Sequence, residues 1–375
     1  RDVAPSRGLG DVYKRQKMIE INEKDVWQRL KEDGKPIAVY GMGNAAEKII
    51  EILHENEIEI NEIFASDEFV RGHSFLGKKV LKYSEVCEKY DDFNIVLAFA
   101  THLPDVLERI KAMNAEHPVF APDIPVAGNG LFTGKYFDEH RAEFQTVYDN
   151  LADDESRRVY ENVLKFKISG KVDYLYKCNE YDKGKIYTDI LRLGGNETMI
   201  DCGAYDGDTI SEFTASTGGK YNHIYALEPD GKNFKKLCRN TDGMQGITLY
   251  NAGAWCKSET LFFEKKAGRN SKLSSVGEPT EFKAIDDLIG DNSVSLIKMD
   301  IEGAEMNALC GCEKTIKRCL PKLYICAYHR NEDMFALPQK IWELNKNYKI
   351  YFRHSVYIPA WESNFYCICN EKECE

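Results

Sequence analysis

Short apolar runs alternate with amphipathic segments in the first third of the chain. Apolar runs cover residues 36–40, 60–66 and 94–100, and the helix-like segment 47–56 follows the first of them. Strands that alternate with helices are typical of βαβ units, in which a helix links two parallel strands. The pattern therefore predicts a small α/β domain with a parallel sheet that ends near residue 130.

The C-terminal half repeats this alternation with more strands. Seven apolar runs are visible, at residues 199–201, 223–228, 247–251, 294–300, 323–328, 348–352 and 365–369. Helix-like stretches separate the first five, whereas a short polar connection joins the last two. Because a parallel return needs a dozen or more residues, the last two are expected to pair antiparallel. The prediction is a doubly wound Rossmann-like sheet of five parallel strands, closed by an antiparallel hairpin.

The stretches outside these two sheets set the predicted domain limits. Helical spacing and many Tyr, Glu, Asp and Arg residues mark the segment between the sheets as a helical linker or lid. At the start, residues 1–17 show no apolar periodicity, and a helix-like segment over 20–32 begins just after Met18. We expect a non-native extension at 1–17, a small Rossmann-like domain at 18–130, the helical linker or lid at 131–195 and the main α/β domain at 196–375.

Composition narrows the class of protein. The formal net charge is −11, which disfavours broad binding to nucleic acid. No apolar stretch approaches the ~20 residues that a membrane-spanning helix needs, and no secretion signal is visible, so we expect a cytoplasmic protein. The twelve cysteines include no CxxC pair. The closest pairs, Cys310–Cys312 and Cys367–Cys369, lack zinc-site spacing, so we predict free thiols and no bound metal.

The most informative motif follows the first strand of the C-terminal sheet. The loop after Asp201 holds Gly203 and Gly207 in GxxxG spacing, and it also carries Asp206 and Asp208. A dinucleotide site has GxGxxG, whose backbone amides hold a pyrophosphate. Three carboxylates would repel a pyrophosphate, but they suit a ligand with an ammonium and a sulfonium group. The motif therefore predicts S-adenosylmethionine, bound by Asp201, Gly203, Ala204, Tyr205, Asp206, Gly207 and Thr209.

Two further strand ends extend this predicted cofactor site. Glu228, followed by Pro229, ends the second strand, where an acidic residue accepts hydrogen bonds from ribose hydroxyls in nucleotide-binding sheets. Ala252, after the third strand, is expected near the adenine. The alternative is that Asp208 only caps a helix and Glu228 is a solvated turn residue.

The fourth and fifth strand ends hold the predicted acceptor site. Asp300 and Glu302 follow the fourth strand, and His329 follows the fifth. Methyl transfer from a sulfonium is an in-line displacement that mainly needs positioning, and a base matters when the acceptor is a hydroxyl. Asp300 or His329 would serve as that base. The alternative interpretation makes Lys298 and Glu305 surface charges, Asp300 a helix cap and His329 structural.

Together these motifs resemble the FkbM methyltransferase family over roughly residues 150–370. The resemblance rests on residues 201–209, on Glu228-Pro229, on residues 297–305 and on the strand end 328–330. It implies a class I methyltransferase that uses S-adenosylmethionine to methylate a hydroxyl of a sugar, glycan or secondary metabolite, with Asp300 and Glu302 in the active site. It does not identify the acceptor. The glycine-rich segment 268–277 is either a mobile acceptor loop or an ordinary surface loop.

The N-terminal domain carries a weaker nucleotide motif. Gly41 and Gly43 form a GxG whose third position is Ala46, and Asp67 follows the next strand. The segment resembles the small Rossmann-like domain fused to sugar-modifying enzymes, which implies a nucleotide or nucleotide-sugar ligand. The alternative is a structural role or one in a homo-oligomer. His102 is expected near the same edge or in an ordinary loop.

Two other functions remain open from the sequence. One is a noncatalytic module that senses a nucleotide through residues 36–130. The other is a nicotinamide-dependent reductase that uses Gly41 and Gly43, although no hydride-acceptor site is recognisable.

Overall fold

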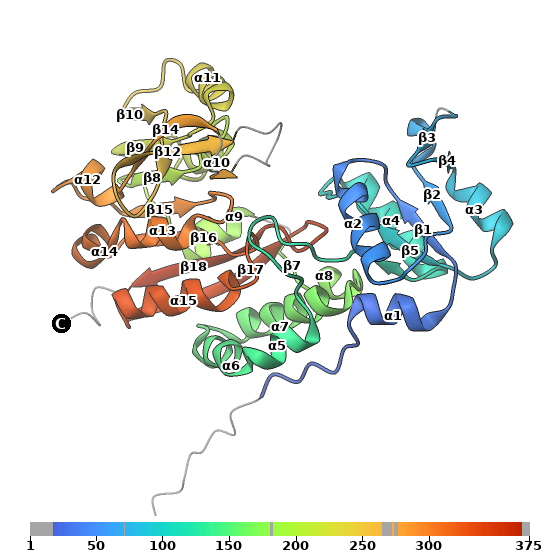
Figure 1. Cartoon of the computed structure of the whole chain (residues 1–375). Coiled ribbons are helices and arrows are strands. Elements are labelled where there is room, and N and C mark those ends of the chain that lie inside the picture. Colours follow the sequence, from blue (N-terminus) through green and yellow to red (C-terminus); the bar gives the residue numbers. More distant parts are fainter. Residues whose placement is uncertain (1–17, 71, 181–182, 265–271, 274–276, 370–375) are drawn as a thin grey trace, which may run out of the picture.

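The computed structural model describes residues 18–70, 72–180, 183–264, 272–273 and 277–369. These residues form a small sheet near the N-terminus, a large sheet built from the C-terminal half, and a third sheet inserted beside the large one (Figure 1). Within the described ranges, every helix is too short or too polar to cross a membrane.

The small sheet has the strand order β3-β4-β2-β1-β5-β6 and is parallel except for β3. Its elements are α1 (Val26–Asp33), β1 (Ile37–Tyr40), α2 (Asn44–Glu55), β2 (Glu62–Phe64), the 3₁₀ helix η1 (Asp67–Phe69), β3 (Ser74–Phe75), β4 (Lys78–Leu81), α3 (Tyr83–Lys89), β5 (Asn94–Leu97), α4 (Pro104–Glu116) and β6 (Val119–Phe120). The predicted parallel α/β arrangement is confirmed, with three additional strands. The helix expected over 20–32 begins only at Val26, because the side chain of Asp25 accepts the Trp27 N–H and caps it there.

The segment between the two sheets is helical, as expected. It contains α5 (Gly134–Glu139), α6 (Arg141–Asn150), α7 (Asp154–Ser169), α8 (Asp173–Tyr176), β7 (Asn179–Glu180), α9 (Lys183–Lys185) and the π-helix η2 (Ile186–Ile190). Helix α7 packs on the large sheet, and its Tyr160 hydroxyl donates to the carbonyl of Met334, in a helix beside that sheet, at 2.8 Å. Arg353 also pairs with Asp153, just before α7, at 2.8 Å. This helix therefore belongs to the core of the large sheet.

The large sheet has the order β10-β9-β8-β15-β16-β18-β17-β7. Its strands are β8 (Thr198–Cys202), β9 (His223–Leu227), β10 (Ile247–Tyr250), β15 (Leu296–Met299), β16 (Lys322–Cys326), β17 (Tyr348–Ser355) and β18 (Ser363–Cys369), with β7 at the edge. The first five in the order are mutually parallel, and β18 runs antiparallel to both β16 and β17. The predicted five parallel strands and closing hairpin are confirmed. The two-residue strand β7 was not predicted, because it is too short to leave a pattern.

Helices cover both faces of this sheet, so its central strands are buried on each side, whereas the edge strand β10 is half-buried (Figure 1). The helices are α10 (Asp208–Ser216), α11 (Gly231–Asn240), α12 (Ile285–Ile289), α13 (Glu305–Cys310), α14 (Glu313–Cys319) and α15 (Asp333–Leu344). In β8, Met199 packs into one apolar cluster while Ile200 packs into another. Burial on both faces explains why these strands read as continuous apolar runs.

A third sheet lies between β10 and α12 in sequence. It consists of β11 (Gly253–Ala254), β12 (Glu259–Glu264), β13 (Lys272–Leu273) and β14 (Glu278–Lys283) in the order β11-β14-β12-β13. The sequence pattern did not predict it. Most of the segment 268–277, interpreted above as a loop, lies outside the described residues.

Candidate functional site

The loop between β8 and α10 is a tight turn at the carboxyl edge of the large sheet. Gly203 has φ 83° and Gly207 has φ 93°, which are left-handed conformations that favour glycine. A Cβ on Gly203 would lie 1.9 Å from the carbonyl oxygen of Asp300, so the turn packs directly against the end of β15. Gly207 is also the N-cap of α10, which places Asp208 in the first helical turn. The predicted loop conformation is confirmed.

Glu228 holds this loop through backbone hydrogen bonds. Its Oε2 accepts the N–H of Tyr205 at 3.0 Å, and its Oε1 accepts the N–H of Asp230 at 2.7 Å. Burial raises the pKa of Glu228 to about 7, although both backbone donors act in the opposite direction. The carboxylate is therefore a buried, oriented acceptor. The alternative that it is a solvated turn residue is wrong.

The other predicted cofactor residues lie at the ends of β8, β9 and β10. Tyr205 is exposed, with the Lys236 ammonium 5.2 Å from its ring centroid. Asn240 donates to the Asp206 carbonyl at 2.7 Å, which ties the loop to α11. Ala252 is buried after β10. Ala204 and Pro229 lie in the connections after β8 and β9, and Thr209 lies in the first turn of the helix that follows β8.

Lys298 joins the cofactor loop to the end of β15. Its ammonium lies 3.2 Å from Asp201 Oδ1, donates to the Gly203 carbonyl at 3.1 Å and lies 4.0 Å from Asp300 Oδ2. Asp201 is completely buried, and this burial raises its pKa although Lys298 acts against it. The interpretation of Lys298 as a surface charge is wrong. The position of this lysine inside an otherwise apolar strand is a sequence feature from which a buried charged partner could have been predicted.

Asp300 and Glu302 lie on a strained turn between β15 and α13. Asp300 Oδ1 accepts the Tyr328 hydroxyl at 3.1 Å. Glu302 has φ 53°, which is rare for a residue with a side chain. The N-cap of α13 is Ala304, so the alternative that Asp300 caps this helix is wrong. Tyr328 was not predicted as a site residue, because its proximity to Asp300 depends on the pairing of β15 with β16.

His329 lies among three carboxylates. Its Nε2 is 3.4 Å from Asp300 Oδ1 and 3.6 Å from Glu302 Oε2, and its Nδ1 is 2.9 Å from Glu305 Oε1. Burial lowers the pKa of His329, but Glu305, Asp300 and Glu302 outweigh this effect and raise it to about 10. The ring is therefore protonated at neutral pH. A protonated ring does not accept a proton, so this geometry does not favour His329 as the base.

The N-terminal part of the chain borders this edge of the large sheet. The Ala127 N–H donates to the His329 carbonyl at 2.8 Å, and a Cβ on Gly303 would lie 2.6 Å from the Ala127 Cβ. The turn between β17 and β18 reaches the small sheet, where His102 stacks on Tyr357 with ring centroids 5.4 Å apart. His102 therefore lies at the contact between the two sheets.

The residues of the predicted second site lie at the carboxyl edge of the small sheet. Gly41 has φ 126°, and its Cβ would lie 3.0 Å from the Phe99 ring. Gly43 is the N-cap of α2, and Asp67 is exposed at the start of η1. Because β1 pairs with β2, the glycines and Asp67 lie at neighbouring strand ends.

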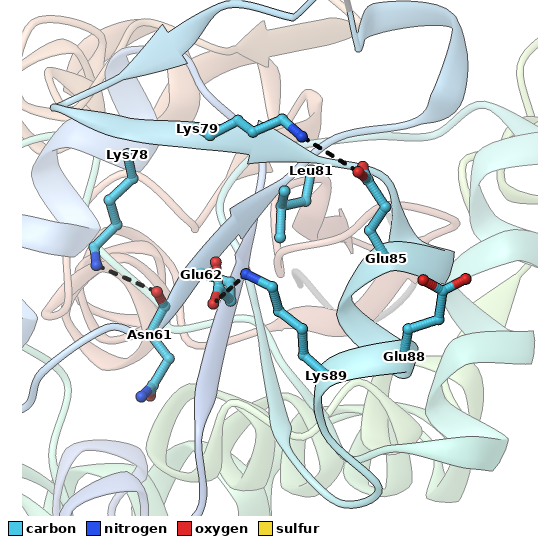
Figure 2. Close-up of a pocket in the computed structure, with 8 residues that line it drawn as sticks. All are labelled: Asn61, Glu62, Lys78, Lys79, Leu81, Glu85, Glu88 and Lys89. Atoms are coloured by element: carbon cyan, nitrogen blue, oxygen red, sulfur yellow. Dashed lines mark hydrogen bonds and ion pairs between the residues drawn. The ribbon is translucent and has the colours of Figure 1, made fainter.

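The structure also contains an open groove of about 630 Å³ that shares no residue with these sites (Figure 2). It lies on β2, β4 and α3, where Lys79 pairs with Glu85 at 3.4 Å and Lys89 pairs with Glu62 at 3.0 Å. Its lining has as many lysines as glutamates, so the groove has no marked preference for a charged ligand (Figure 2).

In the part of the chain that the structure describes, the cysteines are free thiols, and no cluster of His, Cys, Asp or Glu is arranged to hold a metal ion.

Comparisons with known proteins agree with this geometry. Residues 201–350 match the model of the methyltransferase FkbM domain. The chain is similar in structure to methyltransferase FkbM from Methylobacillus flagellatus KT, with a TM-score of 0.69 and 23% identity over 91% of this chain and 92% of that chain. At this identity the likeness shows the fold.

Two other solved structures align with about half of the chain. An rRNA methylase from Streptococcus thermophilus gives a TM-score of 0.34 at 13% identity, over 50% of this chain and 95% of that one. A putative methyltransferase from Streptococcus mutans, solved in complex with SAH, gives a TM-score of 0.32 at 10% identity, over 50% of this chain and 94% of that one. No curated protein matches the chain. Residues 201–350 thus match the FkbM methyltransferase domain, and the chain has an α/β fold of the class I methyltransferase type.

Proposed function

We propose that the protein transfers a methyl group from S-adenosylmethionine to a hydroxyl oxygen of a sugar, glycan or secondary metabolite. One observation supports this most strongly. The cofactor loop with Glu228 and the acidic turn with Asp300 meet at one edge of the large sheet, on either side of Lys298. Ligands of open α/β sheets bind at this edge.

The residues of the loop fit the proposed cofactor. Glu228 is oriented by two backbone donors and has lone pairs left for the ribose hydroxyls. The turn at Gly203 and Gly207 leaves little side-chain bulk near the ligand. Asp201 is fully enclosed, so we propose that it acts through Lys298 and the loop backbone and does not touch the ligand. The bound cofactor would supply an activated sulfonium methyl.

The acidic turn would bind the acceptor. The side chains of Asp300 and Glu302 are 31% and 28% exposed, so their carboxylates are accessible to a hydroxyl. We propose that Asp300, fixed by Tyr328, orients the hydroxyl and takes its proton, with Glu302 as a second contact. His329 would remain cationic and balance the charge of these carboxylates. Catalysis would then rest mainly on positioning the acceptor in line with the methyl group.

The N-terminal domain would bind a nucleotide or nucleotide-sugar through Gly41, Gly43 and Asp67. Support comes from the shared edge of β1 and β2 and from the contact between His102 and Tyr357. In this proposal, the small domain would present part of the acceptor to the methyltransferase site.

Calorimetry tests the cofactor proposal. Protein lacking residues 1–17 is titrated with S-adenosylmethionine and S-adenosylhomocysteine, alongside Glu228→Gln and Asp201→Asn variants. Glu85→Gln, in the groove on α3, is the matched control. We expect micromolar binding by the wild type and the control, and loss of about tenfold or more in Glu228→Gln.

The absence of binding by the folded wild-type protein would refute the proposed use of S-adenosylmethionine. The next titration would then use nucleotides, with Gly41→Val as the variant, to test the noncatalytic alternative. Binding by the wild type would justify a screen of hydroxylated acceptors.

A further inference from the structure

One buried carboxylate connects the acidic turn to His329. Glu305 is the first residue of α13, and its exposed fraction is 0%. Its Oε1 accepts the N–H of Ile301 at 2.9 Å and lies 2.9 Å from Nδ1 of His329. A single oxygen therefore fixes both the backbone after Asp300 and the imidazole ring. The interpretation of Glu305 as a surface charge is wrong.

The other nitrogen of the His329 ring lies near the two partly exposed carboxylates of the acidic turn. Because Nδ1 bonds to Glu305, Nε2 points to the other side of the ring. It lies 3.4 Å from Asp300 Oδ1 and 3.6 Å from Glu302 Oε2. His329 thus stands between one enclosed carboxylate and two accessible ones.

Of the carboxylates around His329, Glu305 is the one whose oxygen lies within hydrogen-bond distance of a ring nitrogen. From α15, Asp333 is buried, and this burial, with the nearby charge of Glu305, raises its pKa well above the ordinary value. Its carboxyl accepts the Arg330 N–H at 2.9 Å. The Arg330 guanidinium is engaged with the Gly303 carbonyl at 2.7 Å. The Tyr328 ring lies 4.2 Å from the His329 ring, centroid to centroid, and its hydroxyl donates to Asp300.

We propose that Glu305 is a positioning residue for methyl transfer, which holds the His329 ring as an imidazolium whose positive charge, 3.4–3.6 Å from the carboxylates at Nε2, keeps Asp300 and Glu302 oriented toward the acceptor. The proposal rests on the proposed function, because it assigns the acceptor to this turn. Glu305 itself does not reach the acceptor, since it is fully enclosed. Buried groups that orient the residues in contact with a ligand typically change activity by about 10–100-fold when they are removed.

A second buried histidine shows how burial acts on an imidazole that has no carboxylate beside it. His354 is also completely buried, but its ring nitrogens face the Ser363 hydroxyl at 3.0 Å and the Tyr357 carbonyl at 3.1 Å. Burial lowers the pKa of His354 to about 4. The two histidines are thus similarly buried, but at neutral pH His354 is neutral and His329 is cationic, and the three carboxylates around His329 account for the difference.

The test compares histidine titrations in the full-length wild type and in Glu305→Gln by NMR of histidine-labelled protein. His329→Gln and His354→Gln spectra assign the two resonances. In the wild type, His329 is expected to stay protonated up to a pKa of about 10. In Glu305→Gln its pKa should fall by at least about two units, while that of His354 should not move. An unchanged His329 titration would overturn the proposal.

Methylation rates measured at several pH values distinguish a positioning role of Glu305 from a purely structural one. With an acceptor that the wild type methylates, the rate of Glu305→Gln at about pH 8 should fall about 10–100-fold and recover in part below the lowered pKa of His329. Glu305→Asp keeps the charge and should retain a raised His329 pKa and part of the rate. A full rate in Glu305→Gln at all pH values, with a lowered His329 pKa, would refute the positioning role.

Cofactor binding keeps the two proposals distinguishable. Glu305 touches neither Glu228 nor the loop at Gly203, so Glu305→Gln should bind S-adenosylhomocysteine within about threefold of the wild type. If the wild type does not bind this ligand, the proposed function fails, while the NMR titration still decides whether Glu305 sets the charge of His329.

Discussion

Acidification through neutral pH should release S-adenosylhomocysteine from the protein, because Glu228 takes up a proton. Burial raises the pKa of this carboxyl to about 7 in the free protein, against the opposing effect of the Asp230 and Tyr205 N–H groups. The ribose hydroxyls would donate to the ionised carboxylate. Binding therefore favours the deprotonated form and should lower the pKa of Glu228 in the complex.

The size of the effect follows from the free-protein pKa. With a pKa of about 7, roughly nine tenths of the Glu228 carboxyls are ionised at pH 8 and about one tenth at pH 6. If only the ionised form binds well, the dissociation constant should rise about eight- to tenfold between these two pH values. The direction of the pH dependence follows from this, because Glu228 must be deprotonated to bind and its protonation at lower pH therefore raises the dissociation constant.

Isothermal titration calorimetry at several pH values measures this dependence directly. Repeating the titration at pH 6.5 in two buffers with different ionisation enthalpies counts the protons released on binding, for which we expect a value between one half and one. Glu228→Gln should bind weakly, with little change across the pH range. A wild-type dissociation constant that stays within twofold from pH 6 to pH 8 would refute the role assigned to this carboxylate, and an equal slope in Glu228→Gln would assign the titration to another group.

Three further predictions concern stability. Gly203→Ala should lower the free energy of unfolding in urea by more than about 3 kcal/mol, because its Cβ would lie 1.9 Å from a carbonyl oxygen. Gly218→Ala is the control: Gly218 has φ 62° but open space around it, so the free energy of unfolding should fall by only about 1 kcal/mol. Asp123→Asn should lose about 3–5 kcal/mol because it leaves Lys167 buried without its partner, and a thermal midpoint equal to the wild type would contradict this. Burial lowers the pKa of His354 from 6.5 to about 4, so below pH 6.5 the unfolded chain takes up a proton that the folded protein does not. The free energy of unfolding should therefore fall as the pH decreases from about 6.5 to about 4. His354→Gln should reduce this fall, which the denaturant midpoints at several pH values measure.

Strands β1, β2 and β5 of the small sheet and all strands of the large sheet except β7 were predictable, because each carries its own pattern. A strand buried on both faces is a continuous apolar run, and polar helical segments separate such runs. The closing hairpin also followed from the sequence, since its connection is too short for a parallel return. The inserted third sheet escaped prediction because its strands alternate without a strong apolar run, as in Glu278–Lys283, where few side chains are buried.

The residue types of the candidate site were predictable where they follow a strand. The glycines at 203 and 207, Glu228 and Asp300 all stand at strand ends, and parallel strands bring their carboxyl ends to one edge. Their charge states were not predictable. The interpretation of His329 as a base assumed an ordinary histidine pKa, but three carboxylates up to 29 residues away in the sequence raise that pKa to about 10.

The sequence by itself determined which segments form strands, that the C-terminal sheet is doubly wound, and which acidic residues lie at its carboxyl edge, because these properties depend on local pattern and connection length. Only the tertiary structure decided that Lys298 is buried against Asp201, that Glu305 is enclosed beside His329, and that Ala127 packs over the acidic turn. Charge and burial at a given residue are set by neighbours from distant parts of the chain, and these neighbours are brought together only by the packing of the sheets.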